Sequence, residues 1–187
     1  MKEFRIHGRG GQGSVATAEL LAIAAFENGF ESQAFPYLGG GGERRGAPVQ
    51  AFARIDTEPI RLKCQIENPH YVLVQDVTLL GQVDVLKGIR ENGVVLVNTE
   101  LEVGELDWEP GDDLQIYTFP ATEIALEILG RPIMNTSMIG ALAVILNGEI
   151  SVESLQKAAR RKFPGEVGEK NAEAVEVAFN KARQLFE

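Results

Sequence analysis

The chain has 187 residues, 44% of them hydrophobic and 24% charged, which is enough apolar sequence for the core of one domain over residues 1–187. Its formal net charge of −9 at pH 7 argues against nucleic acid as a partner, and no window is apolar enough to predict a membrane span. Cys64 is the single cysteine, which excludes an internal disulfide and an iron–sulfur cluster held by this chain's own cysteines.

Histidine content and charge distribution narrow the class of protein further. His7 and His70 show no metal-ligand spacing, so we expect no metal site and assign no catalytic residue. Glycines and charges interrupt the first ten residues, which lack the apolar core of a signal peptide, and we expect a cytoplasmic protein. Residues 1–63 carry a balance of +1 and residues 64–187 one of −10. The first third therefore suits a phosphate-bearing ligand or an acidic partner, although ordinary surface charge explains it equally well.

The first third of the chain predicts strands around one helix. Val15, Ala18 and Leu21 fall at helical spacing, and Asn28-Gly29 predicts the end of this helix, which we place at residues 14–27. Strands are predicted at residues 4–7, 31–37, 46–56 and 58–64. The last two are expected to form a hairpin around a turn at residues 56–59.

The remaining two thirds alternate between strands and helices. Strands are predicted at residues 71–76, 92–100 and 114–119, and helices at 77–89 (weakly), 120–130, 135–148 and 166–186. The acidic residues 100–113 predict an exposed loop or short hairpin. Such alternation is typical of a parallel sheet. The fold class predicted is α/β: an open, mostly parallel Rossmann-like sheet with helices on both faces and an inserted β-hairpin.

The segment "GRGGQG" carries the first candidate site. Gly8, Gly10 and Gly13 form a G-x-G-x-x-G between a predicted strand and a predicted helix. Gly8 suits a tight turn, Gly10 a close approach to a ligand and Gly13 the packing of the helix on the strand. Backbone amides at the helix start, with Gly11 and Gln12 beside them, would face an anion and gain from the helix dipole.

Two observations weigh against a dinucleotide at this turn. A dinucleotide site has an acid at the end of the second strand to bind the ribose, and here that strand ends in Phe35-Pro36-Tyr37. The P-loop alternative fails as well, because no Gly-Lys-Ser/Thr follows. A purely structural turn therefore stays open beside anion binding.

A second glycine cluster follows at residues 39–42 and leads into Glu43, Arg44, Arg45 and Gly46. Four successive glycines predict a mobile loop or a place where another backbone or a ligand lies close. The two arginines would point to opposite faces if extended, and either one could form a bidentate contact with a phosphate or with a carboxylate of another subunit.

These residues carry a family resemblance. "GRGGQG" before an Ala-rich helix, then "FP" and "GERRGAPVQAFARI", resembles the gamma subunit of 2-oxoacid:ferredoxin oxidoreductases, especially of the pyruvate type. "PATEIALEILG" and "NTSMIGAL" resemble the second half of that family, so the likeness covers most of residues 4–147. The run at residues 39–42 is longer here than is usual in the family.

The resemblance implies a part in a larger enzyme. The complete complex converts a 2-oxoacid and coenzyme A to acyl-CoA and CO2 and reduces ferredoxin. Thiamine diphosphate and iron–sulfur clusters belong to the alpha, beta and delta-type partners. This chain would act in assembly and, as a hypothesis, contact coenzyme A through residues 8–13 and 43–46. The alternatives are a subunit of an indolepyruvate or 2-oxoglutarate enzyme, a stand-alone Rossmann-like nucleotide-binding oxidoreductase and a homo-oligomeric interaction module.

Four further features have ordinary structural explanations. His7 ends a strand, where a backbone partner is favoured over a phosphate. Cys64 is expected to be a small buried hydrophobe. The apolar residues 138–146 are expected in the core, and Glu123 stabilises the start of its helix.

Overall fold

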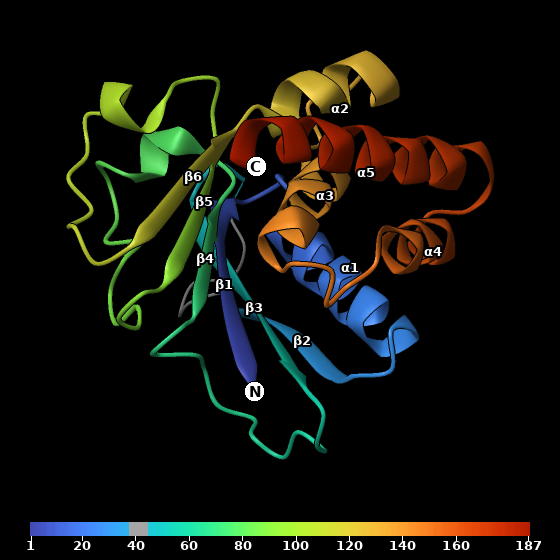
Figure 1. Cartoon of the computed structure of the whole chain (residues 1–187), viewed down its shortest axis with the longest axis horizontal. Coiled ribbons are helices and arrows are strands. Elements are labelled where there is room, and N and C mark those ends of the chain that lie inside the picture. Colours follow the sequence, from blue (N-terminus) through green and yellow to red (C-terminus); the bar gives the residue numbers. More distant parts are fainter. Residues whose placement is uncertain (38–44) are drawn as a thin grey trace.

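The computed structural model describes residues 1–37 and 45–187. Within this part of the chain, six strands form one sheet in the order β2-β3-β1-β4-β5-β6 (Figure 1). The strands are β1 (Lys2–Arg9), β2 (Glu31–Tyr37), β3 (Pro48–Asp56), β4 (Tyr71–Val74), β5 (Val94–Asn98) and β6 (Gln115–Phe119). β1, β4, β5 and β6 are successively parallel, whereas β3 is antiparallel to both β1 and β2. The predicted open, mostly parallel α/β sheet is confirmed.

The α-helices lie together on one face of this sheet (Figure 1). They are α1 (Ser14–Glu27), α2 (Ala121–Leu129), α3 (Asn135–Ile145), α4 (Val152–Lys162) and α5 (Gly165–Phe186). Strand side chains such as Phe4, Leu73 and Phe119 pack against them in one large apolar core. α3 is buried from Asn135 to Val144, because α1, α2, α4 and α5 all pack against it. The prediction that residues 138–146 belong to the core is confirmed.

The opposite face is covered by irregular chain. Val72, Val74, Val95 and Val97 pack there against apolar residues of segments 77–89 and 108–116. The connection from β4 to β5 contains the 3-10 helix η2 (Val77–Leu79), and the connection from β5 to β6 contains the 3-10 helix η3 (Val103–Glu105). The helix predicted over residues 77–89 is wrong, because only η2 forms there. Asp84 Oδ1 accepts from the Leu86 N–H at 3.2 Å, a local bond that competes with helical bonding, and Gly88 has a positive φ of 70°. The prediction of helices on both faces is therefore only half correct: the described α-helices lie on one face, and the other face carries irregular segments with two short 3-10 helices.

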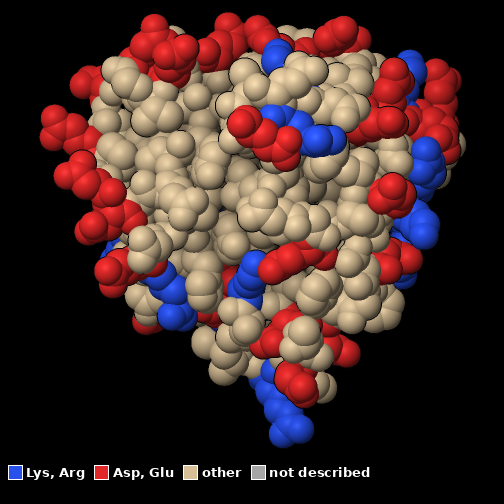
Figure 2. Space-filling model, in the orientation of Figure 1, with Lys and Arg blue, Asp and Glu red and all other residues tan. Residues whose placement is uncertain are grey.

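Negative charge gathers on this irregular layer. Residues 100–113 include seven carboxylates and no Lys or Arg. Figure 2 shows acidic side chains along the left rim of the molecule, where Figure 1 places this segment. None of the helices within the described residues has the length and apolarity needed to cross a bilayer.

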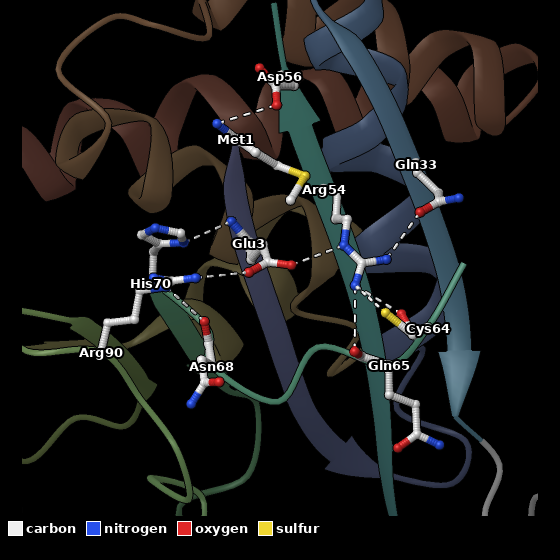
Figure 3. Close-up of polar contacts among 10 residues, drawn as sticks. All are labelled: Met1, Glu3, Gln33, Arg54, Asp56, Cys64, Gln65, Asn68, His70 and Arg90. Carbon is white, nitrogen blue, oxygen red and sulfur yellow. Dashed lines mark hydrogen bonds and ion pairs between the residues drawn. The ribbon is translucent and has the colours of Figure 1, made fainter. Parts of the chain in front are cut away.

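The predicted hairpin at residues 46–64 is only half correct. β3 forms as expected, but residues 58–64 are not a strand, and the antiparallel partners of β3 are β1 and β2. A buried guanidinium ties the following segment to the sheet instead (Figure 3). Arg54 donates from Nε to Glu3 Oε1 at 3.0 Å and from a terminal nitrogen to the Cys64 carbonyl oxygen at 2.8 Å. The Cys64 side chain is exposed, so the prediction that it is buried is wrong.

Candidate functional site

The carboxyl ends of β1, β4, β5 and β6 meet at one edge of the sheet. From β1 the chain runs through α1 to β2 on one side, whereas β4 lies on the other side of β1, so the direction of winding changes between β1 and β4. Such a switch point is where open α/β sheets bind ligands. A cavity of about 650 Å³ opens there. It is lined by Gly11, Gln12, Gln75, Asp76, Val77, Asn98, Thr99, Glu100, Leu101, Pro120, Thr122, Glu123, Pro132, Ile133 and Met134.

Two glycines of the turn make room for buried polar side chains. A Cβ at Gly8 would lie 2.3 Å from Ser14 Oγ and 2.8 Å from Gln75 Oε1. Gly13 caps α1 in the left-handed region with φ 76°, and a Cβ there would lie 2.5 Å from Asn135 Nδ2. β1 continues through Gly8 to Arg9, so the tight turn predicted at Gly8 is made by residues 9–12 instead, where the Gln12 N–H donates to the Arg9 carbonyl oxygen at 2.9 Å.

Gln75 stands at the centre of these polar side chains and is 1% exposed. Its Oε1 accepts from Ser14 Oγ at 2.6 Å, and its Nε2 donates to Thr17 Oγ1 at 2.9 Å and Asn135 Oδ1 at 3.1 Å. Asn98 Nδ2 donates to the Gln75 carbonyl oxygen at 2.9 Å. Together these bonds hold α1 and α3 on the ends of β4 and β5. The sequence analysis missed these residues, although both Gln75 and Asn98 directly follow apolar strand residues.

The side chains of Arg9 and Gln12 form bonds to other residues of this chain. Arg9 Nε pairs with Asp76 Oδ2 at 3.1 Å, and Gln12 Nε2 donates to the same oxygen at 2.9 Å. Gln12 Oε1 in turn accepts from the Arg9 backbone N–H at 2.8 Å. Partial burial would raise the pKa of Asp76, but hydrogen bonds from Thr78 and Gln12 and the charge of Arg9 lower it below its usual value. The turn is thus tied to β4 by a carboxylate that stays ionised.

The two glycine-rich motifs meet in space. The Gly46 N–H donates to the Gly10 carbonyl oxygen at 2.9 Å, and the Gly10 N–H donates to the Ala47 carbonyl oxygen at 2.8 Å. The close approach predicted at Gly10 is therefore one by the chain's own backbone. Arg45 is exposed and would lie 3.7 Å, through its Cγ, from a Cβ at Gly11. Glu43, Arg44 and the glycines at 39–42 lie outside the described residues.

The start of α1 opens into a second cavity, of about 350 Å³. It is lined by Gly11, Gly13, Ser14, Val15, Ala16, Glu19, Val49 and Gln50. No side chain caps this helix start, so the first-turn N–H groups have no such partner within the described chain. The helix dipole favours an anion here, and Glu19, the one carboxylate in this lining, pairs with Lys162. The larger cavity is lined by the carboxylates of Asp76, Glu100 and Glu123, of which Glu100 has no ion-pair partner among the described residues.

His7 lies beneath the turn and is 2% exposed. Its Nε2 accepts from Arg5 Nε at 3.0 Å, so the partner is a side chain rather than the backbone predicted from the sequence. Burial, helped by the charge of Arg5, lowers the pKa of His7 to about 3. His7 is therefore a neutral structural side chain at physiological pH. Within the described residues, no group of three or more His, Cys, Asp or Glu side chains could hold a metal ion.

The strand order bears on the dinucleotide alternative. In a dinucleotide fold the strand after the first helix lies beside the first strand and supplies the ribose-binding acid. Here β3 lies between β1 and β2, with Gly8 opposite Val49 and Arg9 opposite Pro48. The strand β2 is thus one strand too far away, in addition to lacking the acid.

Known proteins match the chain over nearly its whole length. Residues 3–181 match the family described as pyruvate ferredoxin/flavodoxin oxidoreductase. The pyruvate synthase subunit PorC of Methanothermobacter thermautotrophicus is 51% identical, covering 99% of this chain and 98% of its own. The pyruvate/ketoisovalerate oxidoreductases common subunit gamma of Thermococcus kodakarensis is also 51% identical, with 97% of each chain covered.

A solved structure agrees with these sequence relatives. The crystal structure of pyruvate oxidoreductase subunit PORC from Thermotoga maritima matches with a TM-score of 0.81 at 37% identity. The match covers 96% of this chain and 95% of that one. The chain belongs to the pyruvate ferredoxin/flavodoxin oxidoreductase family.

Proposed function

We propose that this chain is the gamma subunit of a heteromeric, pyruvate-type 2-oxoacid:ferredoxin oxidoreductase. The observation that carries the proposal is 51% identity to a PorC subunit of pyruvate synthase over almost the full length of both chains. The complex would convert a 2-oxoacid and coenzyme A to acyl-CoA and CO2, and would pass the electrons to ferredoxin. Its other parts would be alpha, beta and delta-type subunits, assembled in the cytoplasm.

The redox and decarboxylation chemistry is assigned to those partners. A cluster of iron and sulfur needs several cysteine ligands, and this chain has one cysteine. The described residues therefore do not fit such a group, and we derive no step for them through a cluster or thiamine diphosphate. The part left to this chain is assembly and, within the same proposal, contact with coenzyme A.

The start of α1 is the place on this chain that best suits a phosphate of coenzyme A. It combines uncapped backbone N–H groups, a cavity of about 350 Å³ and the exposed Arg45 near Gly11. The larger cavity suits an anion less well, because its lining includes the carboxylate of Glu100, which has no ion-pair partner among the described residues, whereas the one carboxylate of the smaller cavity, Glu19, pairs with Lys162. Among the candidate residues, Gly13 and Arg45 would then touch the ligand most directly, whereas Gln12 and Gly10 hold the turn.

Purification of the native chain from its source tests the complex. Thiamine-bearing and cysteine-rich partners should co-purify, and the preparation should reduce ferredoxin with pyruvate only when coenzyme A is present.

The relative named as a common subunit of pyruvate and ketoisovalerate enzymes supports a gamma chain that does not select the 2-oxoacid. Assays with 2-ketoisovalerate, 2-oxoglutarate and indolepyruvate therefore decide the substrate. Recovery of the chain alone, with tight calorimetric binding of NAD, NADP or FAD, would replace the proposal by the stand-alone alternative.

Substitution of the arginines tests the contact with coenzyme A. In the purified complex, Arg45→Ala and the double variant Arg44→Ala/Arg45→Ala should raise the KM for coenzyme A about ten-fold, because one charge-assisted contact is lost. The KM for pyruvate should stay unchanged. Arg61→Ala is the matched control, since Arg61 is an exposed arginine that belongs to neither glycine-rich motif. Wild-type KM values and intact assembly in both variants would show that this loop has neither role.

A further inference from the structure

β6 forms an open edge of the sheet. It follows β5 as the last strand of the order and pairs with it in parallel. The Gln115 N–H donates to the Gly93 carbonyl oxygen at 3.0 Å, and the Thr99 N–H donates to the Phe119 carbonyl oxygen at 3.1 Å. Alternate residues of a parallel strand bond to the same neighbour, so the N–H and C=O groups of Ile116 and Thr118 face outward. No other described residue bonds to them.

The open edge borders a groove of about 650 Å³. Its walls are the segment around η3 on one side and the last residues of α5 on the other. The Tyr117 ring packs against the Phe186 ring at an interplanar angle of 58°, with ring centroids 4.8 Å apart. Leu101, Val103 and Leu185 line the groove and are 45%, 39% and 56% exposed. Apolar side chains on both sides of an unpaired strand form a surface that a bound segment would bury.

The strand lacks the features that protect a free edge. Exposed edges are usually interrupted by Pro, by a charged side chain or by a bulge. The sequence QIYTF of β6 has no Pro and no charged residue, and it pairs with β5 in unbroken register. Lys181 lines the groove, but its charge is used by Glu123 at 3.3 Å. The edge is therefore open to strand addition.

The charge beside the edge selects the kind of segment. Residues 100–113 carry Glu100, Glu102, Glu105, Asp107, Glu109, Asp112 and Asp113. None of them forms an ion pair with another described residue. A second copy of this chain would bring two such acidic segments together, which like-charge repulsion opposes. A Lys- or Arg-bearing segment of another polypeptide would neutralise them.

We propose that the open edge of β6 binds an extended, basic segment of a partner polypeptide as a further strand of the sheet. Main-chain bonds to Ile116 and Thr118 supply the pairing, in the way that extended peptides add to exposed sheet edges. Alternate side chains of the segment enter the groove against Tyr117 and Leu185 on one side and Val103 on the other. We take the partner to be another subunit of the oxidoreductase complex, and in that respect the inference rests on the proposed function.

Thr118→Pro is the sharpest test. Proline removes the outward N–H, while the bonds to β5 come from Gln115, Tyr117 and Phe119 and are kept. In the complex reconstituted from its subunits, Thr118→Pro should weaken binding of this chain at least about ten-fold, a loss expected for a main-chain bond and the fit around it. Thr118→Val keeps the N–H and should bind within about two-fold of wild type. A folded Thr118→Pro chain that assembles with wild-type affinity would overturn the inference.

Two further measurements keep the test decisive if the proline variant fails to fold. Amide exchange at Ile116 and Thr118 should slow on assembly, and unchanged exchange would contradict strand addition. Glu109→Lys/Asp112→Lys should weaken assembly, whereas Glu58→Lys/Glu173→Lys, with the same net charge, should not.

Failure of the wild-type chain to co-purify with any subunit would refute the proposed function instead. A dimer of this chain, lost in Thr118→Pro, would identify a second copy as the occupant and overturn the basic partner.

Discussion

Gly13 holds a left-handed conformation that brings the start of α1 against α3. Its φ of 76° is costly for any side chain, and a Cβ would lie 2.5 Å from Asn135 Nδ2. Asn135 cannot turn away freely, because its Oδ1 accepts from Gln75. Gly29 has a similar φ of 88° with nothing within 4 Å of an added Cβ. A substitution at Gly29 therefore measures backbone strain alone, whereas one at Gly13 measures backbone strain together with the steric conflict with Asn135.

We expect Gly13→Ala to lower the free energy of unfolding by about 2–4 kcal/mol and Gly29→Ala by about 1–2 kcal/mol. The second value is the strain of a left-handed alanine, and the difference is the conflict with Asn135. Urea denaturation followed by circular dichroism measures both. Equal losses in the two variants would show that Asn135 moves aside without cost.

His7 couples stability to pH. The unfolded chain protonates His7 near pH 6.5, whereas the folded chain does so only near pH 3. Between these values the unfolded state binds more protons, so stability falls as the pH falls, by up to about 1.4 kcal/mol per pH unit. His7→Gln keeps an acceptor for Arg5 Nε and does not titrate, so it should flatten this slope.

The slope is best measured from pH 6.5 to 5, where most carboxylates stay ionised. His70→Gln serves as the control, because His70 is half-buried and accepts only one bond, from the Glu3 N–H. Burial lowers the pKa of His70 as well, so this variant should remove a smaller part of the slope. If His7→Gln and wild type lose stability equally between these pH values, protonation of His7 is not what makes the stability depend on pH.

At the scale of elements, α3 and α5 pack closely through a glycine. A Cβ at Gly140 would lie 2.5 Å from the Val175 carbonyl oxygen and 3.0 Å from Ala178 Cβ. Alanine favours a helix by about 1 kcal/mol over glycine, but here it would push α5 away from the core. We expect Gly140→Ala to lower the free energy of unfolding by about 1–2 kcal/mol net. Thermal unfolding should show the loss, while Gly81→Ala, with nothing within 4 Å, stays within about 0.5 kcal/mol of wild type. If Gly140→Ala were more stable than wild type, α5 would be able to move away from α3 without a loss of packing energy.

Local signals predicted some elements well and others poorly. The bounds expected for α1 and β2 are those observed, because Asn28-Gly29 separates them clearly. α4 was missed, since Leu155, Ala158 and Ala159 are its only buried apolar residues. A usable signal was Ser151, whose side chain accepts from the Ser154 N–H at the start of α4.

The candidate site was predictable only in its glycines. Gly8 and Gly13 follow a local pattern, and so does their place between a strand and a helix. Gln75 and Asn135 lie 60 residues apart in the sequence and are brought together by the strand order and by α3. No local pattern reports which strands are neighbours, or that β3 lies between β1 and β2, and for this reason the polar network was beyond sequence reasoning.

At the scale of the whole molecule, the two faces of the sheet differ in construction. Within the described residues, one face carries five α-helices, four of them around the buried α3, and the other carries irregular segments with two short 3-10 helices. Regular helices satisfy their backbone groups internally, whereas exposed loop amides are open to water. Stability should therefore be distributed unevenly, with the weaker layer on the side of the acidic segment.

Hydrogen exchange on the isolated chain tests this distribution. Amides in the middle of α3 should exchange only through global unfolding, whereas amides of residues 100–113 should exchange through local opening. Given an ordinary global stability of about 5 kcal/mol or more, the two sets should differ in protection by a factor of about 10³ or more. Low concentrations of urea should accelerate exchange in α3 and leave residues 100–113 unaffected, because only global unfolding exposes much surface. Similar protection across both layers would show that the acidic segment is as firmly held as the helices, and that the face beside β6 is rigid before any partner binds.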